Sequence, residues 1–178
     1  MNYTHHIMTE DLKNNVNFAR LRELYAVIEG IPSSGIGLKN WKNRELMASE
    51  KRILNGQRSL HECGALACAV GWASLYPPFN ELGLNSHMTV APVFSGQPGT
   101  PFGWYAVMDF FGLDEEEAYG LFLRRPTIGQ LLLIGMRGAD DVGTDKERVL
   151  RRIRSFLVRK KVITRKRADE LARLAPVN

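Results

Sequence analysis

The stretch Cys63-Gly-Ala-Leu-Ala-Cys-Ala-Val-Gly-Trp-Ala-Ser-Leu75 is apolar on all sides and poor in β-branched residues. The first property is typical of a helix inside a core, and the second disfavours a strand. We therefore predict a buried helix over 63–75 that ends before Pro77-Pro78. Gly64, Cys68 and Gly71 fall on one stripe of this helix, where small side chains let a second element approach closely.

Amphipathic spacing and capping residues predict further helices on both sides of this stretch. They are expected over 12–29, 41–54, 104–111, 115–123, 127–136, about 145–160 and 164–174. The fold class is therefore mainly α: a single compact helical domain with at most a short β element near 88–94 and a basic C-terminal helical pair. We expect six of its core residues to be Cys68, Gly71, Trp72, Phe110, Phe111 and Phe122.

Length and composition exclude several classes of protein. The chain has 178 residues, 44% of them hydrophobic, which suits one globular domain with a sizeable core. It has no apolar run of about 18 residues and no apolar signal core at its start, so we expect a cytoplasmic protein without a membrane contact. Two cysteines make no disulfide framework, and no phosphate-binding loop or dinucleotide fingerprint is present, so no cofactor is expected.

Positive charge is concentrated at the C-terminal end. Residues 144–178 hold 12 Lys/Arg and 4 Asp/Glu, a net charge of +8, whereas residues 1–143 hold 12 Lys/Arg and 15 Asp/Glu, a net charge of −3. The segment between them, 137–143, is rich in Gly and Asp, which favour turns. We therefore divide the chain into a helical core domain, 1–143, and a basic C-terminal helical subdomain, 144–178.

The basic segment is the candidate binding site. Val149, Ile153, Phe156 and Leu157 form its apolar face, and the cations occupy the rest of the helix. This surface is expected to contact a nucleic acid or an acidic protein, which includes the acidic part of a second copy in a homodimer, or to be a solvated face without a partner. The expected binding residues are Arg148, Arg151, Arg152, Arg154, Arg159, Lys160, Lys161, Arg165, Lys166 and Arg167.

Three other sites are weaker alternatives. Cys63 at a helix start, with His87 as base, would suit a cysteine-dependent hydrolase or transferase. The set His61, Cys63, Cys68 and His87 would suit a structural zinc site, although its spacing departs from that of standard ligand pairs. A DNA-binding helix-turn-helix over 104–122 is disfavoured, because its recognition helix would begin with four carboxylates.

A part of the chain resembles a known family. The family pattern has a Cys-Gly-x-x-x-Cys-x-x-Gly-x-Ala stretch, found here at 63–73, and then Phe-Gly-Leu-x-x-x-x-Ala-x-x-Leu-Phe, found here at 111–122. In this order and spacing, residues 59–123 resemble small uncharacterised proteins carried by bacteriophages and prophages. The resemblance implies a phage or mobile-element accessory protein that binds a host or phage macromolecule in a bacterial cytoplasm, and it carries over no catalytic residue.

Overall fold

A computed structural model of the chain describes residues 16–39, 41–42, 67–86, 91–95, 100–138 and 140–163. Its helices are α2 (Phe18–Gly30), η1 (Ser33–Gly35), α4 (Ala69–Ala73), α5 (Pro77–Glu81), α6 (Trp104–Phe111), α7 (Glu115–Phe122), α8 (Ile128–Leu133) and α9 (Asp145–Arg159). The strands β1 (Leu84–Asn85) and β2 (Val93–Phe94) pair antiparallel, with Leu84 opposite Phe94. The predicted mainly-α fold class is confirmed. Among the described helices, none has the length and apolar character needed to cross a bilayer.

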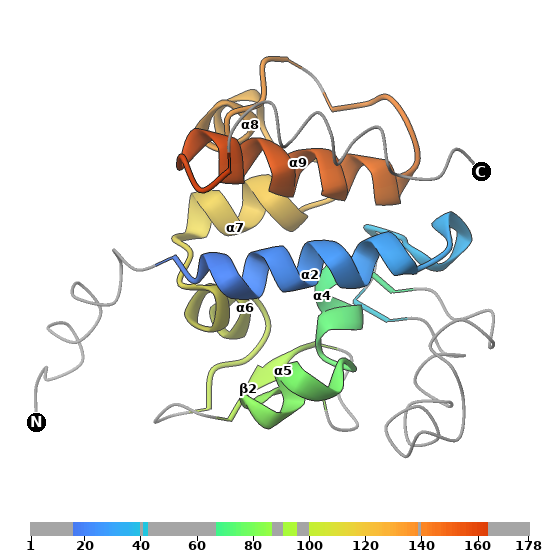
Figure 1. The fold of residues 1–178 in the computed structure, drawn as a ribbon, viewed down its shortest axis with the longest axis vertical. Coiled ribbons are helices and arrows are strands. Elements are labelled where there is room, and N and C mark those ends of the chain that lie inside the picture. Colours follow the sequence, from blue (N-terminus) through green and yellow to red (C-terminus); the bar gives the residue numbers. More distant parts are fainter. Residues whose placement is uncertain are drawn as a thin grey trace, which may run out of the picture.

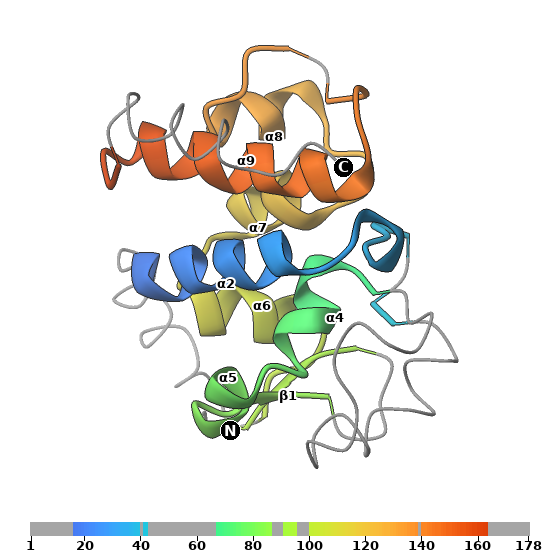
Figure 2. The ribbon, with the colours of Figure 1, turned by 45° about the vertical axis from the view of Figure 1, so that its right-hand side comes forward.

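Helix α2 lies at the centre of the fold. Figure 1 shows it crossing the middle of the molecule, with α7, α8 and α9 on one side and α4, α5 and α6 on the other, and Figure 2 shows the same order from a second direction. Its buried side chains recur every three or four residues, as Leu21, Leu24, Tyr25 and Ile28. Because α2 contacts α9 on one side and α4 and α6 on the other, it joins the two halves of the core.

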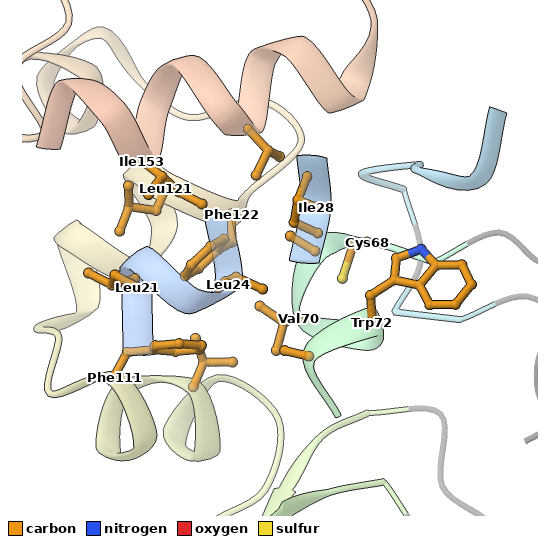
Figure 3. Packing of buried hydrophobic residues seen from close by; sticks show 14 of the residues in the cluster. Leu21, Leu24, Ile28, Cys68, Val70, Trp72, Phe111, Leu121, Phe122 and Ile153 are labelled. Atoms are coloured by element: carbon orange, nitrogen blue, oxygen red, sulfur yellow. The ribbon is translucent and has the colours of Figure 1, made fainter. Parts of the chain in front are cut away.

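One hydrophobic core includes residues from α2, α4, α6, α7 and α9. Figure 3 shows Leu24 and Ile28 of α2 between Val70 of α4 and Ile153 of α9. All six core residues expected from the sequence are buried. The apolar face predicted for α9 is also buried, because its four residues belong to this core.

The buried stretch over 63–75 is less helical than predicted where the structure describes it. All five residues of α4 are buried, but the helix begins at Ala69, and residues 63–66 lie outside the described part of the chain. Ala67 forms β-bridges with Ile36 and Lys42 instead. Its N–H donates to the carbonyl of Gly35 (3.2 Å), and its carbonyl accepts from the N–H of Gly37 (3.0 Å). These bonds to a distant segment use the backbone groups that a longer helix would need.

The two prolines after α4 lie at the start of the next helix. Helix α4 ends at Ala73, as expected, but Pro77 and Pro78 occupy the first turn of α5. A proline is tolerated there because the first N–H groups of a helix have no partner within it and because its fixed φ is already helical.

Three predicted helices, now α6, α7 and α9, have the expected bounds to within about one residue. Helix α2 begins at Phe18, with Asn17 as its N-cap, and residues 12–15 of the predicted helix lie outside the described part of the chain. Helix α8 ends at Leu133, just before Gly135 at φ 86°. Most of the predicted helix 41–54 and all of 164–174 lie outside the described residues, but Trp41 and Lys42 are not helical. The β element predicted near 88–94 is represented by β2.

The described part of the C-terminal segment packs into the core of the rest of the chain. Helix α9 lies against α2 and α7, and its apolar face belongs to the same cluster as theirs. Residue 143 therefore marks a turn before α9, because residues on both sides of it in the sequence belong to the same hydrophobic core. A separate C-terminal subdomain stays a prediction.

A close backbone approach holds the segment at Trp41 against α4. A Cβ atom at Gly71 would lie 1.8 Å from the carbonyl oxygen of Trp41, and that oxygen accepts a hydrogen bond from the N–H of Cys68 (3.2 Å). Only glycine fits this position, which explains one member of the small-residue stripe noted in the sequence.

We predict that Gly71→Ala lowers the free energy of unfolding by about 2–3 kcal/mol, because backbone must move to admit the methyl group. Gly30→Ala is the control, since a Cβ there meets nothing within 4 Å, and its effect should stay below about 1 kcal/mol. Urea unfolding of the two variants measures the difference. Equal stability of both variants would contradict the close approach.

Candidate binding site

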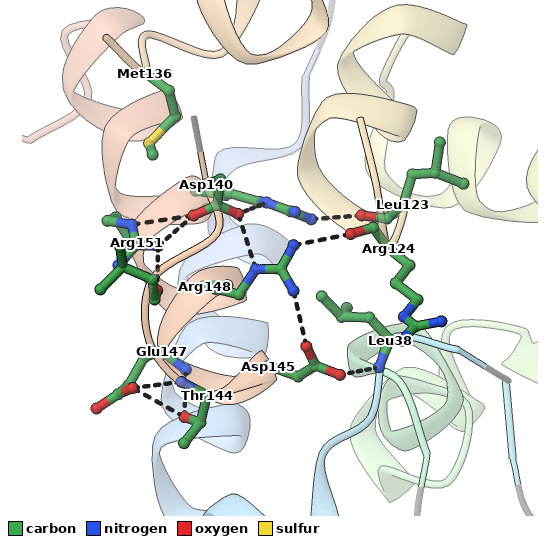
Figure 4. A network of polar contacts seen from close by, with 12 residues as sticks. Leu38, Leu123, Arg124, Met136, Asp140, Thr144, Asp145, Glu147, Arg148 and Arg151 are labelled. Atoms are coloured by element: carbon green, nitrogen blue, oxygen red, sulfur yellow. Dashed lines mark hydrogen bonds and ion pairs between the residues drawn. The ribbon is translucent and has the colours of Figure 1, made fainter. Parts of the chain in front are cut away.

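The carboxylate of Asp140 organises the arginines of α9. Its side chain is only 1% exposed and lies against three guanidinium groups. The Nε of Arg151 donates to Oδ1 (3.1 Å), Arg152 pairs with Oδ2, and the Nε of Arg148 lies 3.5 Å from Oδ2. Figure 4 shows Asp140 between Arg148 and Arg151. Three residues expected on a binding surface are thus engaged inside the protein.

Arg152 is fully buried and is removed from the predicted binding surface. Its Nη1 donates to the carbonyl oxygens of Leu123 (2.6 Å) and Leu121 (3.3 Å), where α7 ends and its last carbonyls need donors. Burial lowers the pKa of Arg152, and the negative charge of Asp140 opposes that effect. The positive charge of this residue therefore stabilises the junction of α7 and α9 and is inaccessible to a partner.

Arg148 joins α9 to two loops. Its Nη2 donates to the carbonyl of Arg124 (2.9 Å), and its Nη1 donates to Oδ1 of Asp145 (3.0 Å). The second oxygen of Asp145 accepts a hydrogen bond from the backbone N–H of Leu38 (2.9 Å). As Figure 4 shows, this chain of contacts connects the loop after α7 with the loop after η1. Arg148 has a structural role here, because its side chain is only 16% exposed.

The other predicted cations lie further along α9. Arg159 is exposed, and its Nη1 donates to the carbonyl of Leu132 (2.7 Å). Lys160 is exposed and pairs with Glu117 (Nζ to Oε1, 2.6 Å). Lys161 is exposed, and Arg154 is half-buried beside Tyr25. Arg165, Lys166 and Arg167 lie outside the described residues.

Of the residues proposed for cysteine or zinc chemistry, the structure describes Cys68 alone, since His61, Cys63 and His87 lie outside the described ranges. The Sγ of Cys68 caps α4 by accepting from the N–H of Gly71 (3.4 Å). Burial raises the pKa of its thiol to about 11, so the thiolate that binds zinc is disfavoured. No cluster of three or more metal-ligating side chains occurs among the described residues.

A hollow of about 330 Å³ opens beside the network of Arg148. Its walls come from the loop after η1, the start of α4, the start of α6 and the end of α7. The residues that line it are Leu38, Lys39, Trp41, Lys42, Cys68, Trp104, Phe122, Leu123 and Arg124. They combine aromatic surface with three cationic residues.

Sequence reasoning found the cations of α9 but missed their partners and the hollow. Asp140 lies in the segment 137–143, for which the content of Gly and Asp predicts only a turn. Lys39, Trp41, Trp104 and Arg124 carry no shared local pattern, since they come from three separate segments of the chain. Only the pairing of Asp145 with Arg148, three residues apart on one helix, had a local signal.

Comparisons of the chain with protein-family models, with curated proteins and with solved structures found no match.

We predict that Asp140→Asn lowers the free energy of unfolding by about 3–5 kcal/mol, because it leaves buried guanidinium groups without a counter-charge. Asp141→Asn is the matched control: the neighbouring side chain is exposed, so its effect should stay within about 0.5 kcal/mol. Chemical denaturation followed by circular dichroism compares the two. An equal decrease in the free energy of unfolding in both variants would show that the Asp140 carboxylate is not needed as a counter-charge for the arginines.

We also predict that Cys68 resists alkylation in the folded protein. In a Cys63→Ala variant it is the remaining thiol, and its pKa of about 11 keeps it protonated at pH 8, while burial excludes the reagent. Iodoacetamide labelling followed by mass spectrometry should find it unmodified until denaturant is added. Rapid labelling of the native protein would contradict this environment.

Proposed function

We propose that this protein acts by binding, and that the cations at the end of α9 and directly after it contact the phosphates of a nucleic acid. The cations run from Arg159 to Arg167, a segment of nine residues that contains six Lys/Arg and no Asp/Glu. Such runs are typical of segments that bind nucleic acid. This run is the observation that carries the proposal.

The described start of the run supports it. Lys161 is exposed, and Arg159 reaches the carbonyl of Leu132 with its guanidinium on the surface. Both follow the part of α9 whose arginines Asp140 engages, so neither belongs to that network. The proposed binding surface is therefore the C-terminal end of the predicted basic face. The arginines that contact Asp140 stabilise the fold instead.

The environment of Cys68 supports binding over cysteine catalysis at that residue. Its thiol is buried and its pKa is raised, which is the reverse of what a nucleophile requires. Cys63 with His87 stays an untested alternative.

The resemblance of residues 59–123 to phage and prophage proteins supports a proposal about the setting in which this protein binds its partner. A phage accessory protein meets nucleic acid and host proteins in the bacterial cytoplasm, so a cationic contact surface suits that setting. The proposed role is that of an accessory binding protein of a phage or mobile element.

An acidic protein is the second candidate partner, favoured by one feature of α8. Three large apolar side chains are exposed there: Ile128 (68%), Leu132 (51%) and Leu133 (44%). Arg159 binds the carbonyl of Leu132, so apolar and cationic groups adjoin one another. Protein interfaces combine such groups, and a negatively charged partner would complement the charge.

The test compares two variants with the same change in net charge. The end variant carries Lys161→Glu, Arg165→Glu and Arg167→Glu, and the control carries Arg22→Glu, Arg125→Glu and Arg137→Glu at exposed positions elsewhere. Arg159 and Lys160 are retained because their contacts with Leu132 and Glu117 belong to the fold. Fluorescence anisotropy measures binding to random duplex DNA, a single strand and an RNA between about 50 and 200 mM salt.

We expect micromolar binding by the unchanged protein and a steep decrease in affinity with salt. Removing three phosphate contacts should make the decrease of log affinity with log salt less steep, by about 3 in the end variant and by less than about 1 in the control. Equal losses of affinity in the end variant and the control would show that net charge alone attracts the nucleic acid, which would overturn the proposal. Binding to poly-glutamate with no binding to any nucleic acid would also overturn it, in favour of an acidic protein.

A further inference from the structure

We propose that the hollow between the loop after η1 and the end of α7 binds a nucleotide. In this assignment the base lies against the indole groups of Trp41 and Trp104, and the phosphate lies between Lys39 and Arg124. The inference does not rest on the nucleic-acid contact proposed above, because none of the described residues that line the hollow belongs to α9 or to the described start of the run after it.

The aromatic wall is preformed. The rings of Trp41 and Trp104 have centroids 4.9 Å apart and are tilted by 59°. Tyr119 packs edge-on against Trp104 at the same centroid distance, which helps to fix the orientation of that indole. Both tryptophans are only partly buried, so part of each ring remains open to a ligand. A flat base stacks on such surfaces without requiring a specific sequence.

The charge of the hollow favours an anion. Lys39 and Arg124 are exposed, and none of the described residues that line the hollow is acidic. The third basic residue of the lining, Lys42, is buried, and its Nζ donates to the hydroxyl of Ser86 (2.7 Å), so Lys39 and Arg124 are the cations that a ligand would meet. Asp145, which accepts a hydrogen bond from the N–H of Leu38 in the wall of the hollow, is also paired with Arg148.

The two cationic walls are held in place by hydrogen bonds that involve neither of their side chains. Arg148 binds the backbone carbonyl of Arg124, and through Asp145 it reaches the backbone N–H of Leu38, next to Lys39. The Trp41 carbonyl is fixed against α4, where Cys68 donates to it. Because these bonds fix the backbone of both walls, only the side chains of Lys39 and Arg124 need to be ordered by a ligand, which lowers the cost of binding.

The size of the hollow fits one small planar ligand. A volume of about 330 Å³ lies at the lower end of the range for small-molecule sites. A base with one phosphate satisfies the aromatic wall and the cations together, whereas inorganic phosphate leaves the wall unused. Such a nucleotide has two sources, a free mononucleotide or one residue of a single strand.

The experiment is a titration of intrinsic tryptophan fluorescence with AMP, adenosine and inorganic phosphate. Trp41 and Trp104 line the hollow, and the third tryptophan, Trp72, is buried with its indole N–H bound to Gly35, so a change in emission reports on the site. Arg124→Ala is compared with Arg125→Ala, an adjacent and equally cationic residue that does not line the hollow. Lys39→Ala is a second variant at the site.

We expect saturable quenching by AMP, and affinities for adenosine and phosphate at least about tenfold weaker. Arg124→Ala and Lys39→Ala should each weaken AMP binding about fivefold or more, while Arg125→Ala leaves it unchanged. Absence of saturable binding of both AMP and a single-stranded oligonucleotide at about 1 mM would overturn the proposal, as would equal losses in Arg124→Ala and Arg125→Ala.

Two further arms separate the sources of the nucleotide and the two proposals. Oligonucleotide binding that depends on Arg124 without AMP binding would assign the site to a nucleotide within a strand, and AMP binding alone would assign it to a free nucleotide. The end variant, which carries Lys161→Glu, Arg165→Glu and Arg167→Glu, should bind AMP as the unchanged protein does. Loss of AMP binding in that variant, with its fold intact, would show that the hollow does not bind AMP independently of the cations after α9.

Discussion

The rest of the structure depends on the pairing of Asp140 with the arginines of α9. This helix is strongly basic, yet it lies against α2 and contributes Val149, Ile153 and Phe156 to the core. Burying its guanidinium groups without a counter-charge would cost more than the apolar face gains, so a carboxylate must enter the same junction. Asp140 supplies it from the loop before α9, and the carbonyls at the end of α7 supply the remaining acceptors. Most of the cations of this helix thus hold the fold, and Arg159 at its end lies on the surface.

Local sequence signals predicted the helices well wherever local interactions decide the structure. The capping boxes at Asp114 and Thr144 place the starts of α7 and α9, because those hydrogen bonds lie within four residues of one another. The start of α4 was wrong because Ala67 pairs with Ile36 and Lys42, segments that no local pattern connects to it. The prolines at 77 and 78 mark a boundary correctly, but proline is favoured both after a helix and in the first turn of the next one.

The same distinction applies to the candidate sites. Composition located the basic segment, since a charge count needs no structure, but it could not show that Arg152 is buried and Lys161 exposed. That outcome depends on Asp140, which lies 12 residues away from Arg152 on a loop whose path is set by tertiary packing. The hollow was beyond sequence reasoning altogether, because Trp41, Trp104 and Arg124 meet only after the chain has folded. Residues that act locally can be predicted singly, whereas a site assembled from distant segments requires the fold.

The contact between α2 and α9 has a consequence for the order in which the protein is made. The ammonium group of Lys146 donates to the carbonyls of Glu29 (2.8 Å) and Ile31 (2.7 Å), residues more than a hundred positions earlier in the chain. A nascent chain that has emerged only as far as α8 therefore exposes one apolar side of its first described helix, together with the end of that helix. Domains form as units during translation, at roughly 5–20 residues per second, so this surface stays uncovered for at least the seconds needed to synthesise α9. The ribosome and its associated chaperones thus meet a form of this protein that the finished molecule conceals.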